Sequence, residues 1–314
     1  MISQLGNIES SSMQPSLSII IPVYNDPSGL EETLNCLVKQ NFPKEQYEVI
    51  VVDNGSKDNT SEIGKKYAHL FPDTIVFVIE NSVKGSYAAR NRGIKVARGE
   101  LLIFIDANIT FDRDYIEKVN NKLKNSDIDY LGCNVKMKMD KYTISSLYDY
   151  INGFKIKEEI ENASYTPTCN LVVRKEVILR AGNFDARLEG GGDFEFGKRV
   201  ASAGFTLDYA EDIVLYHPTR SDYKSLIEKA MRIGRGNAQM AFYYPQKYKY
   251  LMNRHFFLQA FSPRNPLTYF SLIKKEEIVK RTLLSFLFSV YHIPAQLFST
   301  IACLKKSRQL EYHQ

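Results

Sequence analysis

Residues 17–24 read Leu-Ser-Ile-Ile-Ile-Pro-Val-Tyr, and this short apolar run decides the fold. A continuous, β-branched stretch of this length is typical of a strand buried on both faces, as in a parallel sheet. The next residues, Asn-Asp-Pro-Ser-Gly at 25–29, are typical of a turn. Residues 30–40 then have the apolar spacing of a helix. The stretch therefore predicts a buried strand, a tight turn and a helix.

The same alternation continues along the chain. We expect strands at 47–53, 75–80 and 101–106, and helices at 59–71 and 85–97. Buried strands separated by helices of about a dozen residues indicate βαβ units. The sequence therefore predicts an α/β fold with a doubly wound, mostly parallel sheet and helices on both of its faces.

Composition limits the remaining possibilities only loosely. The chain has 314 residues, 44% of them hydrophobic and 25% charged, which suits one large domain with an appendage. Its net charge of +5 is compatible with phosphate-bearing substrates or anionic lipid surfaces and does not choose between them. We expect no nucleic-acid partner.

The cysteines and the N-terminus indicate a cytoplasmic protein. The four cysteines are far apart and form no CxxC pair, so we interpret them as reduced thiols without a disulfide framework or a zinc site. Residues 1–16 have neither a basic segment nor an apolar run, so we expect a disordered lead and no signal peptide.

Polar residues follow three of the predicted strands. They are Tyr24 and Asn25, then Asp53 and Asn54, then Asp106 and Asn108. In an open parallel sheet, ligands bind beyond the carboxyl ends of the strands, so these side chains predict one converging polar site. The alternative for each residue alone is a helix cap or a turn former.

The loop after the first strand argues against two nucleotide-binding classes. It contains neither GxGxxG nor GxxxxGK[ST], which excludes a typical nicotinamide dehydrogenase and a P-loop NTPase. A nucleotidyltransferase fits less well for a similar reason, because it would carry a glycine-rich basic loop at this point.

Several motifs in order carry a family resemblance. They are Ser-Ile-Ile-Ile-Pro-Val-Tyr-Asn at 18–25, Val-Val-Asp-Asn-Gly-Ser-Lys-Asp-Asn-Thr at 51–60, Gly-Ser-Tyr-Ala-Ala-Arg-Asn-Arg-Gly at 85–93, Ala-Arg-Gly-Glu-Leu-Leu-Ile-Phe-Ile-Asp-Ala-Asn at 97–108, Asn-Leu-Val-Val-Arg at 170–174, Gly-Asn-Phe-Asp at 182–185, Gly-Gly-Asp-Phe-Glu at 191–195, and His217. Over about two thirds of its length, the chain resembles the family 2 glycosyltransferases, whose fold is usually called GT-A.

The resemblance implies an inverting glycosyltransferase of the hexosyltransferase type. It implies a nucleotide-diphosphate sugar donor, with a UDP-sugar favoured, and a divalent metal, Mn²⁺ or Mg²⁺. By position, the donor-binding residues would be Pro22, Tyr24, Asp53, Asn54, Arg90 and Asp106. The metal would lie at Asp106, Asn108 and His217, and the catalytic base would be Asp193.

The chain departs from the family pattern at two positions. Asn54 replaces the second residue of an Asp-Asp pair, although its amide still offers a donor and an acceptor. Asn108 replaces the last aspartate of a DxD motif, which removes a charge that Mg²⁺ and Mn²⁺ prefer. For His217, a hydrogen-bonded structural role is the alternative to metal or phosphate binding.

The residues around Asp193 suit proton transfer. Three glycines at 190–192 precede it and permit close approach of backbone and substrate. A carboxylate there could take the proton of an acceptor hydroxyl, and Glu195 is a second candidate. The structural alternative is that Asp193 caps a helix over 194–203. Arg187 and Glu189 are weaker candidates for acceptor contact.

The C-terminal third has a different composition. We expect a catalytic domain over 17–223 and a helical C-terminal extension over 224–314, with a helix at 225–241. Residues 282–304 are apolar and flanked by lysine and arginine, but His292, Pro294 and Gln296 interrupt them. We expect an interfacial helix on the inner face of the membrane, with a single span or a packed core helix as alternatives.

These observations lead to one main expectation about function. It is transfer of a sugar to a hydroxyl of a glycan or lipid-linked acceptor, in the synthesis of a cell-surface polysaccharide or glycolipid. The alternative is a sugar-nucleotide-binding protein with little transfer activity, which the Asn108 substitution permits.

Overall fold

The computed structural model describes residues 14–124, 126–252 and 301. Its strands are β1 (Leu17–Val23), β2 (Tyr47–Asp53), β3 (Ile75–Ile79), β4 (Leu101–Ile105), β5 (Thr110–Phe111), β6 (Tyr130–Lys138), β7 (Asn170–Arg174) and β8 (Leu207–Pro218). The α-helices are α1 (Pro27–Val38), α2 (Thr60–Leu70), α3 (Ser86–Val96), α4 (Tyr115–Lys124), α5 (Ile144–Ile151), α6 (Ile156–Ala163), α7 (Lys175–Ala181), α8 (Gly192–Ser202), α9 (Tyr223–Tyr243) and α10 (Pro245–Tyr248). Two 3-10 turns are η1 (Lys44–Gln46) and η2 (Lys249–Met252).

The strands form one mixed sheet in the order β3-β2-β1-β4-β7-β6-β8-β5. Its N-terminal half, β3-β2-β1-β4, is parallel throughout. In the other half, β7 runs antiparallel to both neighbours and β5 antiparallel to β8, while β6 and β8 are parallel. Four of the seven pairings are parallel, so the expected mostly parallel sheet describes the first half best.

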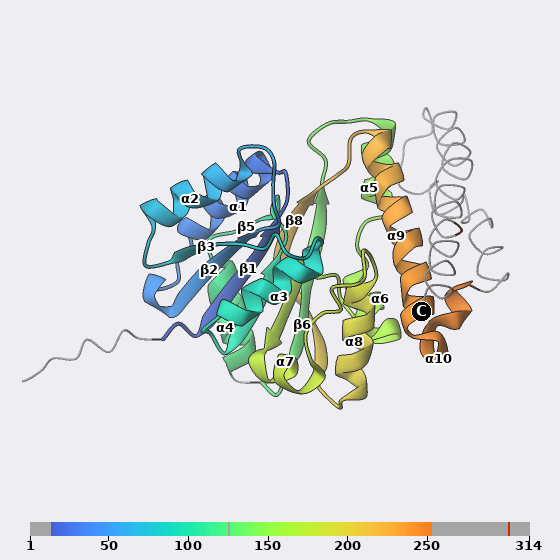
Figure 1. Cartoon of the computed structure of the whole chain (residues 1–314). Coiled ribbons are helices and arrows are strands. Elements are labelled where there is room, and N and C mark those ends of the chain that lie inside the picture. Colours follow the sequence, from blue (N-terminus) through green and yellow to red (C-terminus); the bar gives the residue numbers. More distant parts are fainter. Residues whose placement is uncertain (1–13, 125, 253–300, 302–314) are drawn as a thin grey trace, which may run out of the picture.

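Helices cover both faces of the sheet, as Figure 1 shows. Successive strand residues point to opposite faces, so Ile19 and Ile21 belong to one core and Ile20 to the other. The first core includes apolar residues of α1, α4 and α6. The second includes residues of α3, α7 and α8. Burial on both sides explains why β1 is apolar without alternation.

The chain caps its helices where they begin near the carboxyl edge of the sheet. The Asp26 side chain accepts from the Gly29 N–H at 3.0 Å, and Pro27 occupies the first turn of α1. Asp222 accepts from the Ser225 N–H at 2.8 Å at the start of α9. Because of these caps, α1 begins at Pro27, three residues earlier than the sequence predicts, and α9 begins at Tyr223, two residues earlier.

Helix α9 lies against the glycine-rich loop that precedes α8. The Gly190 carbonyl lies so close to Gly236 that a Cβ at position 236 would collide with it. A Cβ at position 190 would in turn lie 2.8 Å from the Arg232 carbonyl oxygen. The two glycines therefore allow the helix and the loop to touch backbone to backbone.

Two predicted segments lie wholly or largely outside the described residues. The apolar stretch at 282–304 is one of them, apart from Ile301. The lead at 1–16 is the other, although the Gln14 side chain donates to the Arg98 carbonyl and Ser16 bonds to Gln46.

Within the part of the chain that the structure describes, no helix is both long enough and apolar enough to cross a membrane. Of the cysteines, Cys36, Cys133 and Cys169 are free thiols there.

Candidate active site

A cleft of about 470 Å³ opens beyond the carboxyl ends of the parallel strands. Because β2, β1 and β4 are parallel neighbours, the residues that follow them meet at one edge, as the sequence predicts. Its lining residues come from the β1 and β2 ends, the start of α3, the glycine-rich loop and α9: Pro22, Val23, Tyr24, Asn54, Lys84, Gly85, Ser86, Ala89, Glu189, Arg232 and Arg235. Three predicted donor residues, Pro22, Tyr24 and Asn54, are among them.

Asp53 and Asn54 hold the loops that shape this cleft. The Asp53 carboxylate is buried and accepts from the Ser56 N–H at 3.0 Å and from the Ser56 and Ser61 hydroxyls. The Asn54 amide donates to the Glu80 and Val83 carbonyls, and its oxygen accepts from the Gly85 N–H at 2.6 Å. Both donors of Asn54 are therefore used in the loop before α3, and one oxygen lone pair is left for a ligand.

Arg90 and Asp106 form an ion pair, and neither residue is among those that line the cleft. The Arg90 Nη2 lies 2.5 Å from the Asp106 Oδ1, and the guanidinium side chain is only 4% exposed. The Asp106 side chain is 38% exposed, so its second oxygen remains open to a ligand. Arg90 thus orients the carboxylate from the buried side.

The other two predicted metal ligands are polar groups with little solvent contact. The Asn108 Oδ1 is buried and has no hydrogen-bond partner among the described residues. The His217 Nδ1 lies 2.7 Å from the Pro218 carbonyl, which fixes the ring and leaves Nε2 with a lone pair if Nδ1 carries the proton. Burial and the nearby Arg220 charge lower the pKa of His217, so the ring is neutral at pH 7. In the described part of the chain, no three His, Cys, Asp or Glu side chains gather as a metal site.

Asp193 lies in the first turn of α8, directly after the glycines. Burial raises the pKa of its carboxyl above the ordinary aspartate value, while the Phe194 N–H and the charges of Arg90 and Arg232 oppose that shift. A carboxylate in partly desolvated surroundings, held ionised by nearby cations, is suited to accept a proton. Its pKa lies closer to neutrality than that of an exposed aspartate.

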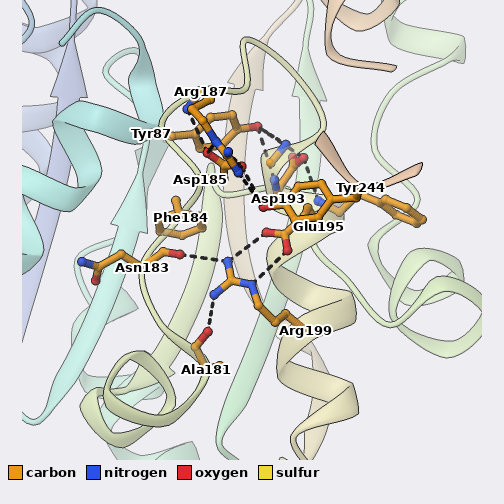
Figure 2. Close-up of polar contacts among 12 residues, drawn as sticks. Tyr87, Ala181, Asn183, Phe184, Asp185, Arg187, Asp193, Glu195, Arg199 and Tyr244 are labelled. Carbon is orange, nitrogen blue, oxygen red and sulfur yellow. Dashed lines mark hydrogen bonds and ion pairs between the residues drawn. The ribbon is translucent and has the colours of Figure 1, made fainter. Parts of the chain in front are cut away.

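Glu195, the second candidate for the base, is committed elsewhere. Figure 2 shows its carboxylate facing Arg199, one turn along α8. Arg199 donates to it from Nε at 2.9 Å and from Nη2 at 2.8 Å, and also to the Ala181 and Asn183 carbonyls. Glu195 is only 3% exposed, so this fork joins α8 to the segment after α7.

Arg187 and Glu189 differ in their surroundings. Arg187 makes a two-pronged ion pair with Asp185 and contacts Tyr244, also visible in Figure 2. Glu189 lines the cleft and accepts from the Arg235 Nε at 2.5 Å, and its backbone N–H donates to the Gln239 side chain. The glycine-rich loop is thereby bound to α9 by side chains as well as by glycine contacts.

Sequence reasoning missed the cations that α9 brings to the cleft. Arg232 and Arg235 both line it, and within the described residues the Arg232 guanidinium makes no hydrogen bond or ion pair. Their three-residue spacing places both on one face of a helix, which was a signal available in the sequence. The ordered family motifs end before α9, so they do not point to Arg232 and Arg235.

Glu159 on α6 was also missed. Burial raises the pKa of its carboxyl to about 7, and the negative charge of Asp193 acts in the same direction. Its Oε2 is buried and has no hydrogen-bond partner in the part of the chain that is described. No residue pattern in α6 signals this, since two other glutamates of the same helix are exposed.

The fold and this cleft define a nucleotide-sugar enzyme of the GT-A type, and comparison with known proteins identifies the family. The model of glycosyl transferase family 2 matches residues 18–181, just over half of the chain. The chain is 36% identical over 231 residues to the glycosyltransferase AglE of Haloferax volcanii, covering 73% of this chain and 75% of that protein. The chain therefore belongs to glycosyltransferase family 2 and is a glycosyltransferase.

The chain is also similar to a more distant relative, and it shares its fold with two solved structures. The chain is 24% identical over 239 residues to a dolichyl N-acetyl-α-D-glucosaminyl phosphate 3-β-D-2,3-diacetamido-2,3-dideoxy-β-D-glucuronosyltransferase of Methanococcus voltae, covering 71% of this chain and 73% of that protein. The mannosyltransferase PcManGT from Pyrobaculum calidifontis, solved with GDP-Man and Mn²⁺, shares its fold with a TM-score of 0.57 and 18% identity over 96% of this chain and 79% of that one. S. aureus TarS 1–349, solved with UDP-GlcNAc, has a TM-score of 0.55 and 20% identity over 94% and 92%.

Proposed function

We propose that this glycosyltransferase moves a sugar from a nucleoside-diphosphate sugar to a hydroxyl of a glycan or lipid-linked acceptor, with inversion at the anomeric carbon. The observation that carries the proposal is the placement of Asp193 beside a cleft that holds three cations, Lys84, Arg232 and Arg235. The relative from Methanococcus voltae, whose name includes a dolichyl-linked sugar phosphate, supports a lipid-linked acceptor.

In the proposed reaction Asp193 is the general base. The acceptor oxygen attacks the anomeric carbon as its proton passes to the Asp193 carboxylate. The bond from that carbon to the diphosphate oxygen breaks, and the nucleoside diphosphate leaves with the electron pair. One direct displacement needs one carboxylate and inverts the configuration. Glu195 does not serve as the base in this scheme, because Arg199 occupies both of its oxygens.

The cations of the cleft bind the diphosphate in this proposal. Arg232 and Arg235 from α9 line the cleft together with Lys84, Gly85 and Ser86. Guanidinium groups bind phosphate oxygens well and stabilise the charge that develops on the leaving group. We therefore extend the proposed catalytic unit beyond residue 223, since α9 supplies two of its cations.

Pro22, Tyr24 and Asn54 line the end of the cleft where we place the nucleoside. Tyr24 is 56% exposed, so its ring is free to lie against a base. Asp53 supports this pocket by holding its loop. The solved neighbours carry UDP-GlcNAc or GDP-Man, and of these two kinds of donor we propose a UDP-sugar for this chain.

A divalent cation is part of the proposed donor site. The donor set fits a weak metal site that substrate phosphates and water would complete. It consists of the Asp106 carboxylate, which has one oxygen paired with Arg90, the Asn108 oxygen, which has no hydrogen-bond partner among the described residues, and the neutral His217 ring. Bound there, Mn²⁺ or Mg²⁺ would supply positive charge for the leaving diphosphate. The Mn²⁺ in the solved mannosyltransferase supports this assignment.

A panel of ligands tests donor binding. We expect UDP, GDP, UDP-GlcNAc or GDP-Man to raise the melting temperature of the full chain by about 5–10 °C near 100 Kd. Each ligand is measured with and without Mn²⁺. If none of the four stabilises the chain in either condition, the donor site is wrongly assigned.

Asp193→Asn tests the base. The amide keeps the shape of the carboxylate but accepts no proton, so donor binding persists while transfer falls about 10²–10⁴-fold. Glu195→Gln is the matched control: it replaces a carboxylate on the same helix by an amide and leaves the Asp193 carboxylate, the proposed proton acceptor, in place. Transfer by Asp193→Asn within tenfold of wild type would overturn the assignment.

A further inference from the structure

Helix α8 carries the proposed base in a first turn that its N-cap residue cannot cap. The N-cap residue is Gly191, with a φ of 74°, and it has no side chain to accept from the free N–H groups of the turn. The backbone N–H groups of Gly192 and Asp193 therefore need a partner from another part of the fold.

That partner is Tyr87 of α3, which Figure 2 shows beside Asp193. Its hydroxyl oxygen accepts from the Gly192 N–H at 2.9 Å and from the Asp193 N–H at 3.3 Å. The same hydroxyl donates to the Asp193 Oδ1 at 3.5 Å. A phenol has one proton and two lone pairs, so these three bonds use its whole capacity.

The position of Tyr87 is closely fixed. The side chain is 5% exposed, and its ring stacks on Phe184 with centroids 5.9 Å apart. A Cβ at position 192 would lie 2.6 Å from the ring, so only glycine lets the ring approach the turn. Burial raises the pKa of Tyr87 far above neutrality, so the hydroxyl keeps its proton for Asp193.

We propose that Tyr87 is the positioning residue of Asp193: it caps α8 from another helix, holds the carboxylate in place and favours its ionised form. This inference rests on the proposed role of Asp193 as general base. Helix α3 begins at the donor cleft with Gly85 and Ser86 and carries Arg90 on a later turn. The same helix therefore connects the donor site to the base.

Other charged or titratable groups also act on Asp193, and all of them except Tyr130, the control position, are unchanged in the experiment below. Arg90 and Arg232 favour its ionised form. The remaining groups within electrostatic reach come from β6, from α6 and the segment after it, and from the residue before β7: Tyr130, Glu159, Tyr165 and Cys169.

The test is the titration of Asp193 in full-length Tyr87→Phe, with aspartate ¹³C-labelled at the carboxyl carbon. The Asp193 signal is assigned by its absence in Asp193→Asn. Removing a hydroxyl that donates to the carboxylate across a long contact of 3.5 Å should move the titration midpoint up by about half a pH unit. The acid limb of the pH–rate profile should move in the same direction.

Tyr130→Phe is the matched control. Its hydroxyl is also buried and makes two backbone bonds, to the Thr166 N–H and carbonyl, but none to Asp193. We expect Tyr130→Phe to lower the melting temperature about as much as Tyr87→Phe does and to leave the titration midpoint of Asp193 unchanged. If both variants leave the midpoint in place, or both move it equally, Tyr87 is only a structural residue and the proposal is wrong.

Two further measurements keep the outcome decisive. If Tyr87→Phe does not fold, Gly192→Ala pushes the ring away from the turn and should raise the midpoint in the same way, and an unchanged midpoint overturns the proposal. The titration needs no substrate, so it separates this inference from the function it rests on. An Asp193→Asn chain that still transfers sugar refutes the base itself, whereas an inactive one with an unmoved Tyr87→Phe midpoint refutes only the positioning role.

Discussion

At the scale of single residues, the site combines groups that we propose bind substrate with groups that hold other side chains and loops in place. Asp53 and Asn54 sit where the family resemblance places nucleoside contacts, yet most of their hydrogen bonds are made with their own loops. Arg90 is buried behind Asp106 and does not line the cleft. We propose that such residues act on the ligand through the loop or the side chain that they orient.

The Arg90–Asp106 pair decides how the metal proposal should be tested. Asp106→Ala would leave a buried guanidinium without a partner, which costs about 3–5 kcal/mol of stability. Asp106→Asn keeps an acceptor for Arg90 and removes the charge. We expect it to weaken Mn²⁺-dependent UDP binding about tenfold, or about 1.4 kcal/mol, in calorimetry.

Asn108 gives the reciprocal variant. Asn108→Asp adds a carboxylate beside the same site and should strengthen the Mn²⁺ dependence, while Asn108→Ala should have a smaller effect than Asp106→Asn. If nucleotide affinity is the same with and without chelator in all three variants, donor binding is independent of metal.

Glu159 makes stability depend on pH. Its pKa is about 7 in the folded chain, against an ordinary value of 4.5. The folded state therefore holds the proton more tightly, and stability falls as pH rises from about 4.5 through 7. Glu159→Gln should raise stability by about 1–3 kcal/mol at pH 8 and change little at pH 4.5.

Melting curves of the two chains at both pH values check this prediction. Glu158→Gln is the control, because Glu158 is exposed on the same helix and pairs only with Lys155. An equal change in melting temperature at pH 4.5 and pH 8 for Glu159→Gln would show that this carboxyl is ionised in the folded chain at both values.

At the scale of elements, the contact between α9 and the glycine-rich loop places the cations of the cleft. Glu189 and Gln239 join the two by side-chain bonds, and Gly190 and Gly236 let their backbones touch. Arg232 and Arg235 both lie within one turn before Gly236 along the helix. A small shift of α9 would therefore move both guanidinium groups.

Gly236→Ala separates helix propensity from this contact. Helix propensity alone predicts that replacing glycine by alanine in a helix interior raises the free energy of unfolding by about 1 kcal/mol. The Gly190 carbonyl occupies the space of the new methyl group, so we expect a loss of about 1–3 kcal/mol and weaker UDP binding. Glu228→Ala, at an exposed position of α9, is the control, and a stabilised Gly236→Ala would contradict the close contact.

At the scale of the whole molecule, the sheet brings distant segments to one edge. The cleft joins residues from 22 to 235, and its walls come from both the parallel half of the sheet and the helix that follows β8. The mixed half carries β7, β6 and β8. His217 lies near the end of β8, and the glycine-rich segment follows α7, the helix after β7.

The membrane proposal also belongs to this scale. From its sequence, we propose that the stretch at 282–304, outside the described residues apart from Ile301, lies at the membrane surface and brings the enzyme to a lipid-linked acceptor. Full-length protein should float with anionic vesicles, less so at high salt, and a chain ending at Lys280 should not. Full-length protein that is monodisperse without detergent and ignores vesicles would refute this.

The sequence by itself determined the first four strands, β1 to β4, and the polar residues at the ends of β1, β2 and β4. Continuous apolar runs such as 17–23 have few alternatives to a doubly buried strand, and polar residues directly after such runs must lie at one edge when the strands are parallel. These are local signals, because a strand and the residue after it are read within a few positions. The cleft residues Pro22, Tyr24 and Asn54 follow from them.

Only the tertiary structure decided which groups meet across that edge. Tyr87 caps a helix that begins more than a hundred positions later, Arg232 reaches the cleft from a helix that follows the ordered motifs, and burial sets the pKa of Glu159. The antiparallel β7 likewise looks like any other buried strand in the sequence. Such facts depend on packing between segments far apart in the chain, and a pattern read along the chain carries no information about which of many compatible segments will be neighbours.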